Sequence, residues 1–116
     1  MNLLDEHTAD LDTKDNPNWG MQIHRDAEYD IELWHGVLIG NQDNTEFAVV
    51  TGPRKYHTCK TATPYVGEPS KATTKEGVTA CVRTSDSRYA YVEIKRFSHN
   101  PDIIQLAVVV WDPPFK

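Results

Sequence analysis

The two cysteines, Cys59 and Cys81, are the residues of this 116-residue chain whose type and spacing most directly suggest chemistry. A disulfide between them would tie a long connection, rich in proline and glycine, to the strand that follows it. Zinc would need a second ligand close to each cysteine, and although His57 lies near Cys59, nothing comparable accompanies Cys81. A reactive thiol would need a cationic setting, for which Arg83 alone is thin evidence. The residues favour a disulfide, and two buried free thiols are the alternative.

Other residues that could do chemistry do not form a recognisable site. The five histidines are scattered and lack the spacing of metal ligands: His7, His24, His35, His57 and His99. The stretch "DLDTKDN" offers the oxygen ligands that calcium uses, but it lacks the glycine and distant glutamate of an EF-hand loop, so a capped turn is favoured. Neither a G-x-S-x-G nucleophile turn nor a glycine-rich phosphate loop is present. We therefore predict a non-catalytic protein without a cofactor or a metal site.

Aromatic and basic side chains in loops and on one strand face are the candidates for a contact surface, because flat rings give a large contact area with little loss of entropy. The predicted contact residues are Trp34, Tyr56, Tyr65, Tyr89 and Tyr91, with Arg54 and Lys55 as charged partners. The alternative is that Trp34 and Trp111 cover the core or the second sheet and that Tyr89 and Tyr91 form cross-strand pairs.

The elements that must position these residues are short strands separated by turns. Alternating or β-branched runs predict strands within 29–40 (with a bend, a bulge or a tight hairpin at Gly36), 45–52, 78–84, 88–97 and 103–112, and a short strand near 9–13. Residues 53–77 are expected to be a long connection with at most one helical turn at 72–77. Because residues 103–112 are apolar on both faces, that strand is expected to be central in its sheet.

The expected fold is an all-β antiparallel sandwich of about six to eight short strands that ends in a three-stranded meander. The expected organisation is an irregular acidic segment at 1–20, the sandwich at 21–112 and a tail at 113–116.

Charge is unevenly distributed along the chain, whose formal net charge is −5. Residues 1–33 carry nine acids against two bases, whereas residues 34–116 carry eight acids against ten bases. An acidic start argues against nucleic acid as a partner. No apolar run is long enough to cross a bilayer. The start "MNLLDEHTAD" lacks the features of a secretory signal, so we expect either a cytosolic protein or a fragment of an exported chain.

Four stretches carry a resemblance to a known family: "DLDT", "YHTCKTATPY", "ACVRTSDSRYAYVEI" and "IIQLAVVVW", in this order. Together they resemble a small β domain of Gram-positive bacterial proteins. It is often found at the outer, C-terminal end of membrane-anchored chains, including some serine/threonine protein kinases. The resemblance implies an extracytoplasmic all-β module with Cys59 and Cys81 paired and without catalytic residues. The chain departs from the pattern at Ser87, where glycine is usual in a tight hairpin.

The preferred functional hypothesis is an extracytoplasmic ligand-sensing or protein-interaction domain, as a fragment of a membrane-anchored protein such as a kinase, with a protein or glycan as ligand. One alternative is a carbohydrate-binding module, which requires two or more exposed, coplanar rings. Another is a small acidic inhibitor or immunity-type protein with a basic partner.

Overall fold

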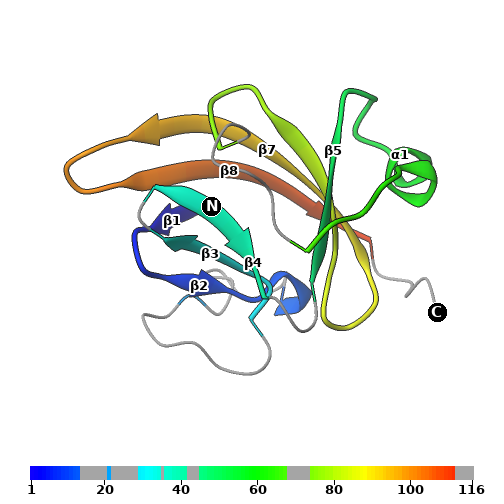
Figure 1. Cartoon of the computed structure of the whole chain (residues 1–116), viewed down its shortest axis with the longest axis horizontal. Coiled ribbons are helices and arrows are strands. Elements are labelled where there is room, and N and C mark those ends of the chain that lie inside the picture. Colours follow the sequence, from blue (N-terminus) through cyan, green and yellow to red (C-terminus); the bar gives the residue numbers. More distant parts are fainter. Residues whose placement is uncertain (14–20, 22–28, 35, 42–44, 68–73, 112–116) are drawn as a thin grey trace.

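The computed structural model describes residues 1–13, 21, 29–34, 36–41, 45–67 and 74–111, and its strands form two antiparallel sheets (Figure 1). The five-stranded sheet has the order β1 (Asn2–Leu4), β8 (Ile103–Val110), β7 (Tyr89–Ser98), β6 (Thr79–Arg83) and β5 (Glu46–Val50). The three-stranded sheet has the order β2 (Thr8–Ala9), β3 (Ile31–Trp34) and β4 (Val37–Gly40). The predicted all-β sandwich is therefore confirmed.

The C-terminal meander is confirmed as well, because β6, β7 and β8 are neighbours in chain order. Strand β8 is paired on both sides, with β1 and β7, as its two apolar faces predicted. Gly36 has a φ of 79° and lies between β3 and β4, so the predicted turn there is a hairpin. Ser87 also has a positive φ, 61°, in the turn between β6 and β7, and therefore keeps the backbone conformation in which glycine is usual.

One hydrophobic core lies between the sheets. Its buried members come from both sheets and from the residues before β3: Leu3, Ala9, Leu11, Ile31, Leu33, Leu38, Phe47, Val82, Ala90, Val92, Ile94, Ile104, Leu106 and Val110. Ala90, Val92 and Ile94 share the inner face of β7, as their alternation predicted. The side chains that alternate with them, including those of Tyr89 and Tyr91, point to the outer face of the five-stranded sheet, away from this core.

The prediction of an irregular N-terminal segment is wrong for residues 1–13. Strand β1 pairs with β8, β2 pairs with β3, and residues Leu11–Thr13 form the 3-10 turn η1. Leu3 and Leu11 are fully buried in the core, so this segment is part of the sandwich. The predicted boundary at residue 21 is therefore misplaced, and residues 14–20 and 113–116 lie outside the described part.

The connection between β5 and β6 contains a helix that the sequence prediction missed. Helix α1 (Tyr56–Thr61) lies against β6 and β7 on the outer side of the five-stranded sheet (Figure 1). Val66 then forms an antiparallel bridge with Phe47 of β5. The helical turn that we expected at 72–77 is absent from its described residues, 74–77.

Candidate functional site

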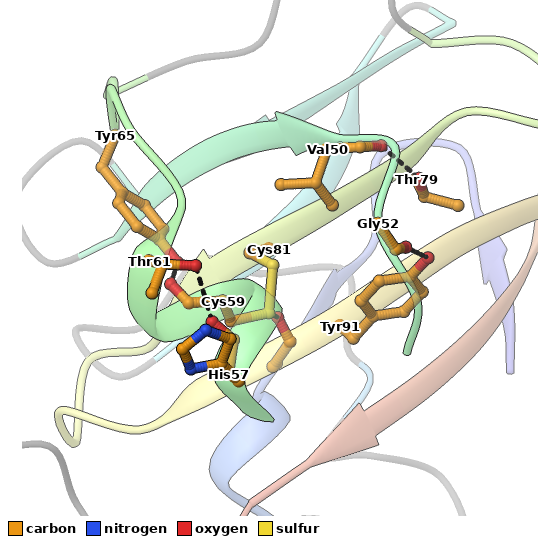
Figure 2. The surroundings of a disulfide bond; sticks show 10 residues. Val50, Gly52, His57, Cys59, Thr61, Tyr65, Thr79, Cys81 and Tyr91 are labelled. Carbon is orange, nitrogen blue, oxygen red and sulfur yellow. Dashed lines mark hydrogen bonds between the residues drawn. A yellow bond between two sulfur atoms is a disulfide. The ribbon is translucent and has the colours of Figure 1, made fainter. Parts of the chain in front are cut away.

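A disulfide joins the middle of α1 to β6, which confirms the predicted pairing of the cysteines (Figure 2). Cys59 and Cys81 have Cα atoms 5.3 Å apart, within the usual range for a disulfide, and both are fully buried. A helix of six residues is too short to be stable alone in water. We infer that the bond and the packing beneath it hold α1 in one position on the sheet.

A small aromatic cluster surrounds the disulfide. Tyr89 and Tyr91 are buried beside the two cysteines, and Tyr56, Tyr65 and Trp111 are partly buried against them. The ring of Tyr56 meets the rings of Tyr89 and Trp111 edge-on, with centroids 5.5 Å and 5.9 Å apart. Edge-to-face contacts of this kind add stability beyond area burial. The cluster thus forms a second core between α1 and the sheet.

Two tyrosine hydroxyls fix the backbone on either side of the disulfide. Tyr65 donates to the carbonyl oxygen of Cys59 at 2.7 Å, and Tyr91 donates to that of Gly52 at 3.1 Å (Figure 2). Burial raises the pKa of the Tyr65 hydroxyl above its ordinary value, which favours the protonated form that donates this bond. The guanidinium of Arg83 lies 4.0 Å from the centre of the Tyr65 ring. These contacts order the chain before and after α1.

The predicted contact residues divide into three groups. Tyr89 and Tyr91, 5% and 6% exposed, are part of the packing under α1, so their prediction as contact residues is wrong. The reason is that Tyr89 and Tyr91 point to the face of β7 opposite the main core, and α1 covers that face. Tyr56 and Tyr65 lie half-buried at the edge of the same cluster.

The other three residues are exposed but do not all lie together. Trp34 is 40% exposed and belongs to β3 in the other sheet, away from the aromatic cluster. Arg54 and Lys55 are exposed directly before α1. The structure therefore groups Arg54 and Lys55 with α1 and separates Trp34 from them.

Of the outward side of α1, only Arg54 and Lys55, directly before the helix, were predicted as contact residues. We define the α1 surface as the exposed side chains of Arg54, Lys55, His57, Lys60 and Thr61. Lys60 and Thr61 were not singled out from the sequence, because no helical period identifies a helix this short. The one available signal was the density of basic residues around Cys59, which lies between Pro53 and Pro64.

A carboxylate cluster holds the N-terminal segment against the β6–β7 turn. Asp12 accepts hydrogen bonds from the hydroxyls of Thr84 and Ser85, at 2.7 Å and 3.1 Å, and from the backbone N–H of Asp86 at 3.1 Å. The guanidinium of Arg88 lies 3.3 Å from Asp12. The predicted capped turn is also present, since the Asp12 N–H donates to Asp10 at 2.9 Å.

Asp30 is the buried member of this cluster. Its carboxylate accepts the backbone N–H groups of Leu11 at 2.8 Å and Ser85 at 2.7 Å. Carboxylate oxygens of Asp10, Asp12 and Asp30 lie within 4.8 Å of one another. Burial, with Asp12 and Asp10 as lesser causes, raises the pKa of Asp30 to about 8. Because donors from the chain engage these carboxylates, we assign the cluster to folding.

A groove of about 490 Å³ lies at the far end of β7 and β8 from α1, where its walls include Lys75, Glu76, Phe97 and His99. His99 stacks on Phe97 with centroids 4.6 Å apart. The groove contains none of the predicted site residues.

The described part of the chain contains no helix with the length and apolar character that crossing a bilayer requires. Comparison of the chain with family models, with curated proteins and with solved structures found no match.

Proposed function

We propose that this chain is a non-catalytic protein-interaction domain that presents the α1 surface to a partner. The observation that carries the proposal is the buried disulfide between Cys59 and Cys81, which fastens a solvent-facing helix to the sheet. Ordering a loop at the moment of binding opposes association, so a recognition element that is already fixed binds more tightly. A β-sandwich that carries recognition residues on an ordered connection is a common arrangement for binding proteins.

We also propose an extracytoplasmic location, as part of a membrane-anchored chain such as a serine/threonine kinase. Disulfides persist in oxidising compartments and are rare in the cytosol, which supports this location. The resemblance of "YHTCKTATPY" and "ACVRTSDSRYAYVEI" to surface domains of such chains supports the host. Alkylation of freshly isolated native protein tests the location, because both thiols should react only after a reductant is added.

The carbohydrate-binding alternative has less support. Stacking on a sugar needs exposed, coplanar rings, whereas Tyr56 meets Tyr89 and Trp111 at interplanar angles of 78° and 81°. Tyr89 is moreover buried. A protein partner is favoured because the exposed part of this region is the polar side of a helix.

A photo-crosslinking residue at Thr61 tests the interaction on intact cells that produce the protein. Thr61 is exposed at the end of α1, and Asn2, exposed on β1 at the sheet edge opposite β5, is the matched control position. We expect a discrete protein adduct from position 61 and none from position 2. The adduct should disappear when Cys59 and Cys81 are both replaced by alanine. Identical adducts from the two positions, or none from position 61, would refute the proposal.

A further inference from the structure

The α1 surface is strongly basic in a protein whose net charge is −5. Arg54, Lys55 and Lys60 are all exposed, and His57 lies exposed among them. The sequence contains no Asp or Glu from residue 47 to residue 67, so the segment has no acid of its own. Without these three bases, the remainder of the chain would carry −5 − 3 = −8. A local positive surface thus stands on a negative molecule.

These three bases also have no ion pair within the described part of the chain. Two bases of the adjoining strands β6 and β7 are paired with acids of the same sheet. Arg83 lies 3.3 Å from Glu46, and Lys95 lies 3.2 Å from Glu93. Glu46 and Glu93 on the outer face of the sheet are therefore paired with other bases and not with the α1 surface.

The size of this surface favours a short ligand. Helix α1 has six residues and is therefore about 9 Å long at 1.5 Å per residue. In an extended peptide, side chains on one face repeat at about 6.6 Å, twice the rise of about 3.3 Å per residue. Two or three carboxylates at alternate positions therefore span a length similar to that of the helix. A short acidic segment is therefore long enough to cover the helix.

We propose that the α1 surface recognises an acidic segment of a partner protein, extended and with Asp or Glu at alternate positions. This inference rests on the proposed function and adds the chemistry of the partner. Arg54, Lys55 and Lys60 supply the attraction, and the disulfide supplies the fixed geometry. Lys60 lies on the helix, and Arg54 and Lys55 lie directly before it. All three can bind a partner without first breaking an internal ion pair, because the described part of the chain shows none for them.

The probe is a synthetic heptapeptide in which Glu alternates with Thr (acetyl-ETETETE-amide), followed by NMR of the amide groups. We expect saturable shifts at residues 54–61. The affinity should fall about tenfold between about 20 mM and about 200 mM salt, where the Debye length shrinks from roughly 20 Å to roughly 7 Å. The same peptide with Gln in place of Glu should bind at least tenfold more weakly. Equal affinity of the two peptides, or the absence of shifts in α1, would overturn the proposal.

The decisive variant replaces Arg54, Lys55 and Lys60 by Glu. Its matched control replaces three other exposed bases, Lys75, Lys95 and Arg96, by Glu, which changes the net charge by the same amount. We expect at least a tenfold loss of peptide affinity in the first variant and less than a threefold loss in the second. Equal losses would overturn the proposal, since they would reflect net charge alone.

Two further outcomes separate this proposal from the function on which it rests. If position 61 still forms its adduct on cells after charge reversal of Arg54, Lys55 and Lys60, the acidic partner is wrong but the interaction domain stands. If a short oligonucleotide of the same charge binds α1 more tightly than the Glu peptide, the choice of an acidic protein segment is wrong.

Discussion

Replacing Cys59 and Cys81 by alanine removes a covalent bond that closes a loop across 22 positions of sequence. In the chain-entropy model, opening a loop of this length lowers the free energy of unfolding by about 3 kcal/mol, because the unfolded chain gains conformations. Both cysteines are fully buried, so losing their sulfur atoms adds a packing loss of about 1 kcal/mol. Small domains have about 5–15 kcal/mol in total, so the variant should remain folded but be clearly weakened.

Urea denaturation followed by circular dichroism measures this loss, and the wild-type protein under reducing conditions is the matched control. Reduction breaks the bond but keeps both sulfur atoms, so it should lower the free energy of unfolding by about 3 kcal/mol and the melting temperature by about 12 °C. The urea m value should rise in both cases, since an unfolded chain without the crosslink exposes more surface. The difference between the reduced protein and the alanine variant gives the packing contribution separately.

Hydrogen exchange then locates the effect within the molecule. Amides of α1 should lose protection in the alanine variant, whereas those of β7 and β8, which are paired in the main sheet, should keep most of theirs. A reduced wild-type protein within about 1 kcal/mol of the oxidised one, with α1 amides still protected, would refute the reasoning. It would mean that the tyrosines alone hold the helix.

Three other expectations follow from single positions. Asp30→Asn should change the pH dependence of stability. Burial raises the pKa of Asp30 to about 8, so between about pH 4 and 8 the native protein holds a proton that the unfolded chain releases. The stability that this group contributes is therefore complete below about pH 4 and is lost as the pH rises through about 8. Urea midpoints across this range should fall with pH more steeply in the wild type than in the variant, and parallel slopes would exclude this protonation. Leu3→Ala should lower the free energy of unfolding by about 2–5 kcal/mol, because Leu3 is fully buried. The control Leu4→Ala, at a side chain that is 37% exposed, should lower it by less than about 1 kcal/mol. Similar losses in the two variants would show that β1 does not contribute to the core. Ser87→Gly should raise stability by about 0.5 kcal/mol, since glycine adopts the observed φ of 61° without a Cβ penalty, and a lower thermal midpoint would contradict this.

The parts of the fold that could be predicted from sequence are those with strong local patterns. Strands β7 and β8 are long, and the alternation of Ala90, Val92 and Ile94 identified the buried face correctly. The cysteine pair was predictable because the chain has only two. In each case the signal lies in residues close together in the chain.

The parts that could not be predicted depend on distant partners. Strands β1 and β2 have three and two residues, too few to show a period, and they form because β8 and β3 supply the neighbouring edges. Helix α1 likewise depends on Cys81 and the tyrosines of β7 rather than on helix propensity. Tyr89 and Tyr91 were assigned to the surface because α1 itself was not foreseen.

The pairing of the first strand with the last has a mechanical consequence. The amino group of Met1 donates to the carbonyl oxygen of Leu106 at 3.0 Å, and the N–H of Leu106 donates to that of Met1 at 2.8 Å. Because β1 runs antiparallel to β8, Met1 lies opposite Leu106, and β8 continues beyond that point to Val110. Tension applied between Met1 and Val110 would load the β1–β8 ladder one rung at a time, starting at Met1. Strand β1 would therefore unzip at low force, while β6, β7 and β8 would stay together behind it.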